Sequence, residues 1–187
     1  TITNNAYGID IENCRGSLIS ENKIYLSSIK GIFAYYSDDG RIIHNTVQNN
    51  SLGTHLDSSN GNDIYQNNFI DNGDQVYVKN SDNTWDNGCE GNFWSDYSGA
   101  DLDGDGVGDT YLPWMGVDSY PLMNPYMVGD VNHDAVVDIF DLVKVAVAFG
   151  STPLDPDWNP HADLVQDSMI DIFDVVLVAN HYGETNP

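Results

Sequence analysis

The sequence predicts a mainly β protein with a small α-helical domain. A parallel β-helix of about three to four coils is followed by a capping segment and a duplicated loop-and-helix unit. Two internal repeats predict this fold class. The first has a period of 22–23 residues, marked by Asn22, Asn45 and Asn67, and the second has a period of 33 residues, which aligns 130–150 with 163–183. Units this short cannot bury an apolar face alone, so neighbouring units are expected to stack.

Composition excludes several functional classes. The 187 residues include 29 acidic and 6 basic side chains, which gives a net charge of −23. Binding to nucleic acid or to an anionic membrane requires a basic face, and no apolar run approaches the length of about 18 residues that predicts a membrane span. The acids are 25 Asp and only 4 Glu. Asp suits tight turns and metal loops, so this excess predicts bound cations.

The acidic residues concentrate in the second half of the chain. Residues 1–79 carry 9 acids and 5 bases, whereas residues 80–187 carry 20 acids and the single base Lys144. This asymmetry predicts a boundary near residue 80–90. We divide the chain into coils at 1–83, a capping segment at 84–126 and a C-terminal domain at 127–187. Cys14 and Cys89 are too few for a disulfide framework, and whether they are bridged stays open.

The coils are expected to consist of short alternating strands between Asn, Ser and Gly corners. Gly8–Ile11 and Gln75–Val78 show the alternation of apolar and polar residues that is typical of a half-buried strand. Equivalent residues of stacked coils lie about 4.8 Å apart, so Asn22, Asn45 and Asn67 are expected to form a structural ladder. Ile2 already occupies a core column. We therefore expect an open N-terminal edge that continues into preceding coils or pairs with another chain. We also expect the chain to be a mature product or a fragment.

These repeats resemble a known family. The units beginning at Asn22, Asn45 and Asn67 are similar to the right-handed β-helix repeats of NosD-like, carbohydrate-binding or sugar-hydrolase proteins, and the similarity continues through 91–99 and 118–122. The resemblance implies a right-handed β-helix in a secreted or cell-surface protein. It does not by itself imply an activity, because fold does not fix function.

No catalytic signature is found in the coils, and the chain is not expected to be an enzyme. Glycosidases need two carboxylates in a fixed geometry, yet no acidic column recurs, and only Arg15 and Arg41 could stabilise the charge that develops in a lyase. Surface solvation is therefore the favoured interpretation of the candidate side chains, which are His44, His55, Asp38, Asp39, Asp57 and Asp63.

The capping segment contains an Asp-rich loop. Asp101, Asp103, Asp105 and Asp109 stand at positions 1, 3, 5 and 9, with Gly106 at the sharp turn and the Val107 carbonyl at position 7. These are the oxygen ligands of an EF-hand-type calcium loop. Position 12 is Leu112, so Asp96 or Asp118 is expected to complete the ligand shell. An aromatic cluster is expected to cap the β-helix rather than stack on sugars; it comprises Trp85, Phe93, Trp94, Tyr97, Tyr111 and Trp114.

The 33-residue repeat places two further calcium loops in the C-terminal domain. The first contains Asp130, Asn132, Asp134, the Val136 carbonyl, Asp138 and Asp141 at positions 1, 3, 5, 7, 9 and 12. The second retains Asp163, Asp167, the Met169 carbonyl, Asp171 and Asp174. Each loop is expected to lead into an amphipathic helix, at Leu142–Phe149 and Val175–Tyr182, with Gly150 and Gly183 placed as C-caps.

The second loop departs from the ligand pattern. Val165 occupies position 3 and cannot ligate through its side chain, while Ala135 and Ser168 replace the Gly expected at position 6. A non-Gly residue is strained wherever φ is positive. We therefore expect about three calcium ions in all, with the 163–174 site the weaker of the two in this domain.

Residues 128–183 resemble a type I-like dockerin, because both loops end in Asp and both lead into a helix. The resemblance implies calcium-dependent docking to a cohesin domain, with loop positions 10 and 11 contacting the partner. Here these positions are Ile139–Phe140 and Ile172–Phe173. Burial of these residues between the two helices is the competing interpretation.

The leading functional hypothesis is an extracellular or cell-surface calcium-binding assembly module, in which the dockerin binds cohesin and anchors a β-helix segment. One alternative is the C-terminal portion of a secreted carbohydrate-active enzyme, with polysaccharide as a partner and the catalytic coils outside this chain. A further alternative is a sheath or filament subunit that self-associates through the open coil edge.

Overall fold

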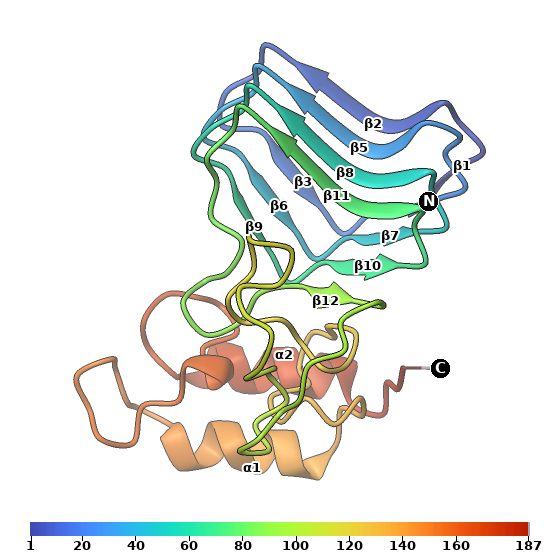
Figure 1. The fold of residues 1–187 in the computed structure, drawn as a ribbon. Coiled ribbons are helices and arrows are strands. Elements are labelled where there is room, and N and C mark those ends of the chain that lie inside the picture. The colour runs from blue at the N-terminus through green and yellow to red at the C-terminus, as the bar shows by residue number, and fades with distance from the viewer. Residues whose placement is uncertain (187) are drawn as a thin grey trace.

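The computed structural model describes residues 1–186 and consists of a stack of parallel strands, with two helices below its C-terminal end (Figure 1). The strands form three parallel sheets. The first has the order β1 (Ile2–Thr3), β4 (Lys23–Tyr25), β7 (Thr46–Gln48), β10 (Asn68–Ile70) and β12 (Phe93–Trp94). The second comprises β2 (Tyr7–Glu12), β5 (Lys30–Tyr35), β8 (Leu52–Asp57) and β11 (Asp74–Lys79). The third comprises β3 (Leu18–Ser20), β6 (Arg41–Ile43) and β9 (Asp63–Tyr65).

The register of these sheets confirms the predicted 22–23-residue coil. Ile24 pairs with Val47, and Val47 pairs with Phe69 in the next strand. Parallel pairing then continues beyond residue 83, because Phe69 also pairs with Trp94 of β12. The prediction of a mainly β parallel solenoid is therefore confirmed, and the segment that follows residue 83 adds a further rung to its first sheet.

The predicted asparagine ladder is present and is longer than the repeat indicated. Asn45 Oδ1 accepts the backbone N–H of Asn22 at 3.0 Å, and Asn67 Oδ1 accepts that of Asn45 at 3.0 Å. Asn92 Oδ1 accepts the N–H of Asn67 at 3.1 Å, and Asp118 Oδ2 accepts that of Asn92 at 2.8 Å. The column thus links every coil to the capping segment through buried side chains.

Similar ladders stabilise the other corners. Residues that immediately precede ladder positions have left-handed backbone, as His44 at φ 57 and Gln66 at φ 55 illustrate. Such a turn interrupts the sheet, so its backbone N–H needs a side-chain partner. Columns of side chains one coil apart provide that partner, and they comprise Asn50 with Asn72, Asn62 with Asn83, and Ser37 with Ser59 and Ser81.

The aromatic cluster caps the core, as expected, with one exception. Trp85 and Trp94 are almost fully buried, and the Trp94 ring stacks on Phe69 at a centroid distance of 4.5 Å. Tyr97 and Trp114 pack edge to face with each other and lie against this core. Tyr111 is 72% exposed, so its predicted place in the cap is wrong.

The C-terminal domain contains α1 (Ile139–Ala148), a 3-10 turn at Pro160–Ala162, and α2 (Ile172–His181). Both helices begin three residues earlier than predicted, since Asp138 and Asp171 act as N-caps. The predicted C-caps are supported, because Gly150 and Gly183 follow the helices with left-handed backbone. None of the helices among the described residues is long and apolar enough to cross a bilayer.

The two loop-and-helix units are related by reciprocal pairing. Gly183 N–H donates to the Val137 carbonyl at 2.8 Å, and Gly150 N–H donates to the Ile170 carbonyl at 2.7 Å. Val137 and Ile170 are 33 residues apart, and so are Gly150 and Gly183. Each loop therefore pairs with the segment that follows the other helix. Val137 and Ile170 are fully buried in one core with Val145 of α1.

The asparagine ladder gives the first testable prediction. Replacing Asn67 with Ala removes the acceptor of the buried Asn45 N–H and the side-chain donor to the carbonyls of Ile42 and Tyr65. At about 1–3 kcal/mol for each unsatisfied buried group, partly relieved by water, we expect the free energy of unfolding to fall by about 3–5 kcal/mol. Denaturant unfolding measures this loss. Asn22→Ala, at the open end of the same column, should cost clearly less, and equal costs would contradict the ladder's role.

Candidate metal centres

Three Asp loops share one local geometry. In each loop, the carboxylate at position 1 accepts the backbone N–H of position 6, and the carboxylate at position 5 accepts that of position 7. The first contacts are Asp101 to Gly106 at 3.0 Å, Asp130 to Ala135 at 2.9 Å and Asp163 to Ser168 at 3.0 Å. The second are Asp105 to Val107 at 2.8 Å, Asp134 to Val136 at 3.0 Å and Asp167 to Met169 at 3.0 Å.

Backbone angles in these loops agree with the strain expected from the sequence. Positions 4 and 6 have positive φ in all three loops. They are Gly104 and Gly106 in the first, His133 and Ala135 in the second, and Gln166 and Ser168 in the third. Only the first loop has Gly at both positions, so Ala135 at φ 71 and Ser168 at φ 69 have backbone that disfavours a Cβ atom.

The carboxylates at positions 9 and 12 close the two C-terminal loops. Asp138 and Asp171 cap the helices, and they form capping boxes with Asp141 and Asp174. Asp141 and Asp174 are fully buried. Asp141 accepts the N–H groups of Val131, Asn132 and Asp138, while Asp174 accepts those of Val165 and Asp171. The last two predicted ligands of each loop are thus fixed by the loop's own backbone.

The loop at 101–109 gathers three of its predicted ligands. Carboxylate oxygens of Asp101, Asp103 and Asp109 lie within 4.8 Å of one another. Asp118 does not complete this set, because its carboxylate is buried at the end of the asparagine ladder, where it also accepts the indole N–H of Trp94 at 2.8 Å. That part of the calcium prediction is wrong. Burial raises the pKa of Asp118 to about 6, although its N–H donors act in the opposite direction.

Several carboxylates of the loops have raised pKa values, whereas for Asp101 burial is outweighed by backbone N–H donors, which lower its pKa. Burial raises the pKa of Asp130 to about 6, and Asp141 and Asp134 add to this rise. Burial also raises the pKa of Asp163, while repulsion from Asp105 raises that of Asp103. Ionising these carboxylates costs free energy, through burial and mutual repulsion, and a bound cation would offset that cost.

The predicted partner-binding residues are exposed. Phe140 is 63% exposed and Phe173 is 62% exposed, and Ile139 and Ile172 beside them are also exposed. Burial between the helices, the competing interpretation, is not what the structure shows. The exposure extends along both helices at equivalent positions, since Val143 matches Val176 and Phe149 matches Tyr182.

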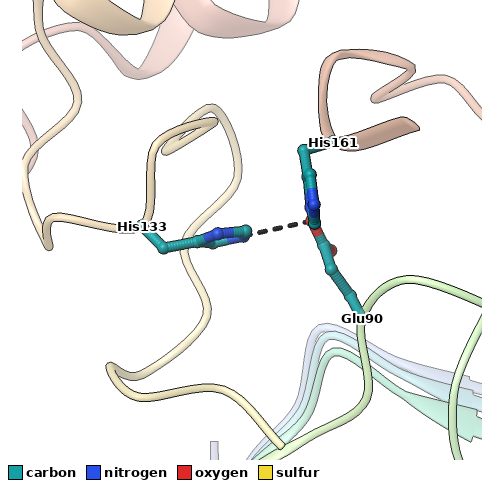
Figure 2. Close-up of side chains that lie close together, drawn as sticks. All are labelled: Glu90, His133 and His161. Atoms are coloured by element: carbon teal, nitrogen blue, oxygen red, sulfur yellow. Dashed lines mark hydrogen bonds and ion pairs between the residues drawn. The ribbon is translucent and has the colours of Figure 1, made fainter. Parts of the chain in front are cut away.

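A second site was not predicted from the sequence. Glu90 lies between two imidazoles, with Oε1 at 3.1 Å from His133 Nε2 and 2.7 Å from His161 Nδ1 (Figure 2). Glu90 and His133 are buried, and His161 is mostly so. Burial would raise the pKa of Glu90, but the hydrogen bonds and charges of the histidines outweigh it and hold this pKa below its usual range. Burial lowers the pKa of His133, but Glu90, the Asp105 carbonyl and Asp130 together outweigh burial and raise this pKa to about 9.

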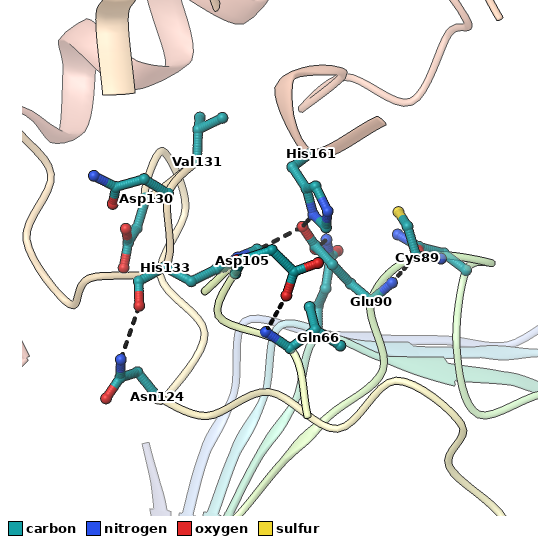
Figure 3. A network of polar contacts seen from close by, with 12 residues as sticks. Gln66, Cys89, Glu90, Asp105, Asn124, Asp130, Val131, His133 and His161 are labelled. Atoms are coloured by element: carbon teal, nitrogen blue, oxygen red, sulfur yellow. Dashed lines mark hydrogen bonds and ion pairs between the residues drawn. The ribbon is translucent and has the colours of Figure 1, made fainter. Parts of the chain in front are cut away.

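This cluster joins the β-helix to the C-terminal domain. Glu90 follows the last full coil, whereas His133 belongs to the loop at 130–141 and His161 to the connection between the helices. Position 4 of each C-terminal loop faces the β-helix, because Gln166, the equivalent of His133, accepts a hydrogen bond from Tyr65 Oη at 2.9 Å. The same network, which includes Gln66, is shown in Figure 3.

The spacing of the cluster explains why the sequence did not reveal it. Glu90 and His133 are 43 residues apart, and Glu90 and His161 are 71 apart. No ligand motif has such spacings. The one available signal was that Glu90 is one of only 4 Glu residues among 29 acids.

Fold and sites together define an acidic β-solenoid with an appended loop-and-helix domain and candidate metal centres. Comparison with known proteins identifies the family to which the chain belongs. A family model described as "Periplasmic copper-binding protein (NosD)" matches residues 1–99, and the chain belongs to this family. The resemblance noted in the repeats is thereby confirmed for the β-helix, and the family's description names copper rather than carbohydrate.

Two curated relatives have similar sequences. A "Probable ABC transporter binding protein NosD" of Pseudomonas aeruginosa is 39% identical over 114 residues, 59% of this chain and 27% of the relative. The protein of the same name from Stutzerimonas stutzeri is 38% identical over 121 residues, 63% of this chain and 27% of the relative. The chain thus spans about a quarter of either length. Both names describe binding proteins, in agreement with the prediction that this chain is not an enzyme. No solved structure matches the chain significantly.

The strain at position 6 gives the second prediction. Replacing Ala135 with Gly removes a Cβ atom from left-handed backbone, which costs about 1–2 kcal/mol for a non-Gly residue, and part of this gain is offset by the greater entropy of unfolded Gly. We expect the C-terminal domain to become about 0.5–1 kcal/mol more stable. Thermal unfolding of the full chain measures the change. The matched control, Ala146→Gly inside α1, should lose about 1 kcal/mol instead, and a loss at both positions would contradict the strain.

Proposed function

We propose that this chain is a calcium-ordered, non-catalytic assembly module that acts outside the cytoplasm. In it, a NosD-type β-helix supports a dockerin-like domain that binds a cohesin-type partner. The observation that carries the proposal is the repetition of one carboxylate cradle in three loops, at 101–109, 130–141 and 163–174. Short Asp side chains fixed around a turn by backbone N–H groups match the hard, oxygen-rich shell that calcium requires.

The fit to calcium differs among the loops. The 130–141 loop offers Asp130, Asn132, Asp134 and Asp138 with the Val136 carbonyl, and the buried Asp141 closes it. The 163–174 loop lacks a side-chain ligand at position 3 because Val165 stands there. Water would have to replace that ligand, so this site is the weaker one. The 101–109 loop has Gly at both left-handed positions and retains more exposed carboxylates.

Pseudo-twofold symmetry supports docking as the role of the C-terminal domain. Exposed apolar side chains occur in equivalent pairs on the two helices, led by Phe140 and Phe173. Position 4 of each loop instead contacts the β-helix, through His133 and Gln166. The apolar pairs are consequently left free for a partner, and paired aromatic anchors are typical of interface hot spots.

A second candidate function is copper handling beside an ABC transporter. It is favoured by the names of the matched family and of its two relatives. The two functions are compatible, because docking would use the exposed helix residues of the C-terminal domain, whereas the family model matches only residues 1–99.

Calcium binding is tested by titration of the full chain after treatment with a chelator. We expect calcium to raise the helix signal and the unfolding temperature, since the ligand geometry is absent from the unfolded chain. When the free calcium concentration is about 100 times the Kd of a site, binding there adds about 2.7 kcal/mol to the free energy of unfolding. Asp130→Ala should remove the stronger C-terminal site and Asp163→Ala the weaker one.

The matched control is Asp157→Ala, which removes the same charge from an exposed position between the helices. Its calcium isotherm should equal that of the unaltered chain. If calcium changes neither the helix signal nor the unfolding temperature, or if all three variants bind equally, the calcium assignment fails.

Docking is tested by binding to a panel of cohesin domains, with calcium and with chelator. We expect one or more cohesins to bind only in calcium. The double variant Phe140→Ala with Phe173→Ala should lose at least about 30-fold in affinity, which corresponds to about 2 kcal/mol for a hot spot.

Leu154→Ala is the control for apolar exposure, because Leu154 is 96% exposed in the connection between the helices. This variant should bind as tightly as the unaltered chain. Absence of binding to every cohesin, in a chain shown to bind calcium, would overturn the docking role and leave the calcium sites standing.

A further inference from the structure

We propose that Glu90, His133 and His161 form a binding site for a divalent transition-metal ion at the junction between the β-helix and the C-terminal domain. Two of its three residues lie outside the segment matched by the family model. None of its ligand atoms belongs to the calcium loops' ligand sets, so the inference does not rest on the proposed function. Its ligands are Glu90 Oε1, His133 Nε2 and His161 Nδ1, which lie within 4.8 Å of one another.

The distances fit one shared ion. Zinc binds imidazole nitrogen and carboxylate oxygen at about 2.0–2.1 Å, so two ligand atoms on a tetrahedral ion are about 3.3 Å apart. Glu90 Oε1 is 3.1 Å from His133 Nε2 and 2.7 Å from His161 Nδ1. Small side-chain shifts suffice to admit an ion among them.

The surrounding groups orient the ligands as a metal site requires. His133 Nδ1 lies 3.1 Å from the carbonyl oxygen of Asp105. A carbonyl only accepts, so Nδ1 carries the proton and Nε2 faces Glu90. A metal-bound histidine commonly donates its other N–H to a backbone carbonyl in this way. Gln66 Nε2 donates to Glu90 Oε2, which leaves Oε1 for the two imidazoles (Figure 3).

An ion pair alone accounts less well for this arrangement. A single protonated histidine would neutralise Glu90, yet two imidazoles converge on the same carboxylate oxygen. The acidic chain, at −23, also attracts cations to this region.

The buried cluster borders a cleft through Glu90 and His161. Glu90 and His161 line a cleft of about 750 Å³ between the two domains, together with Cys89 and Trp158. The cleft supplies an entry path and room for water at the fourth position. Two imidazoles and one carboxylate suit zinc or copper and are poor ligands for calcium, which prefers an all-oxygen shell.

The site is tested by calorimetric titration of the calcium-saturated full chain with Zn²⁺, in a Cys14→Ser, Cys89→Ser background that removes both thiols. We expect one ion to bind. Loss of an outer-shell partner costs about 10–100-fold in metal affinity, so Gln66→Ala should weaken binding about tenfold or more and His161→Ala at least about 100-fold. With Co²⁺ as the probe, the background protein should show visible ligand-field bands that His161→Ala lacks.

His181→Ala is the matched control, because His181 also lies beside a glutamate, with Nδ1 at 3.1 Å from Glu184 Oε1, but outside the cluster. It should bind zinc like the background protein. Far-UV circular dichroism with calcium verifies that each variant folds. If His161→Ala does not fold, Gln66→Ala still tests the site, because it retains all three ligands. Absence of zinc binding to the background protein, or equal affinity in the Gln66, His161 and His181 variants, overturns the site. A chain that binds calcium but no zinc overturns this inference alone.

Discussion

Side chains that replace backbone partners at the corners of the coils hold the β-helix together. Each corner uses a left-handed residue, which breaks the sheet and leaves an N–H without a strand partner. The carboxamide of Asn67 is suited to this place: its oxygen accepts the N–H of Asn45, and its nitrogen donates to the carbonyls of Ile42 and Tyr65. At the last rung stands Asp118 instead of an asparagine. Its carboxylate accepts hydrogen bonds from the Asn92 N–H and the Trp94 indole N–H, and it has no amide N–H to donate. A residue that only accepts suits the end of a ladder, because no further coil needs its donors.

The end of that ladder also positions the junction. Glu90 immediately precedes Gly91 and Asn92, so the rung that fixes the Asn92 backbone also holds the end of the loop from which Glu90 projects. On the other side, His133 is held at left-handed backbone in the loop at 130–141, and its carbonyl accepts Asn124 Nδ2 at 2.8 Å. The histidine ring is thereby directed at Glu90 from a rigid turn. The attachment of the C-terminal domain thus depends on loop geometry.

Local and periodic features could be predicted from the sequence, whereas contacts between distant segments could not. The 22–23-residue repeat predicted the registered sheets and the Asn22, Asn45 and Asn67 column, because stacking turns a sequence period into a contact. Asn92 and Asp118 were missed as later members, since the period lengthens to 25 and 26 residues there. The helices begin earlier than predicted, at Ile139 and Ile172, because Asp138 and Asp171 act as N-caps as well as occupying ligand positions. Glu90, His133 and His161 meet only through the docking of two domains, which no sequence spacing records.

The two kinds of candidate metal centre differ in their ligand atoms, and His133 links them. The Asp loops offer only oxygen, which selects a hard cation, while the junction offers two nitrogens and one oxygen, which selects a borderline one. His133 belongs to both places: its backbone stands at position 4 of the 130–141 loop, and its ring contacts Glu90. A cation in the loop would restrict the backbone on which that ring is mounted, and so would lower the entropy cost of bringing three ligands together. The loop's own hydrogen bonds, from Asp134 and Ala135 N–H to Asp130, already fix the turn from which the His133 ring reaches Glu90.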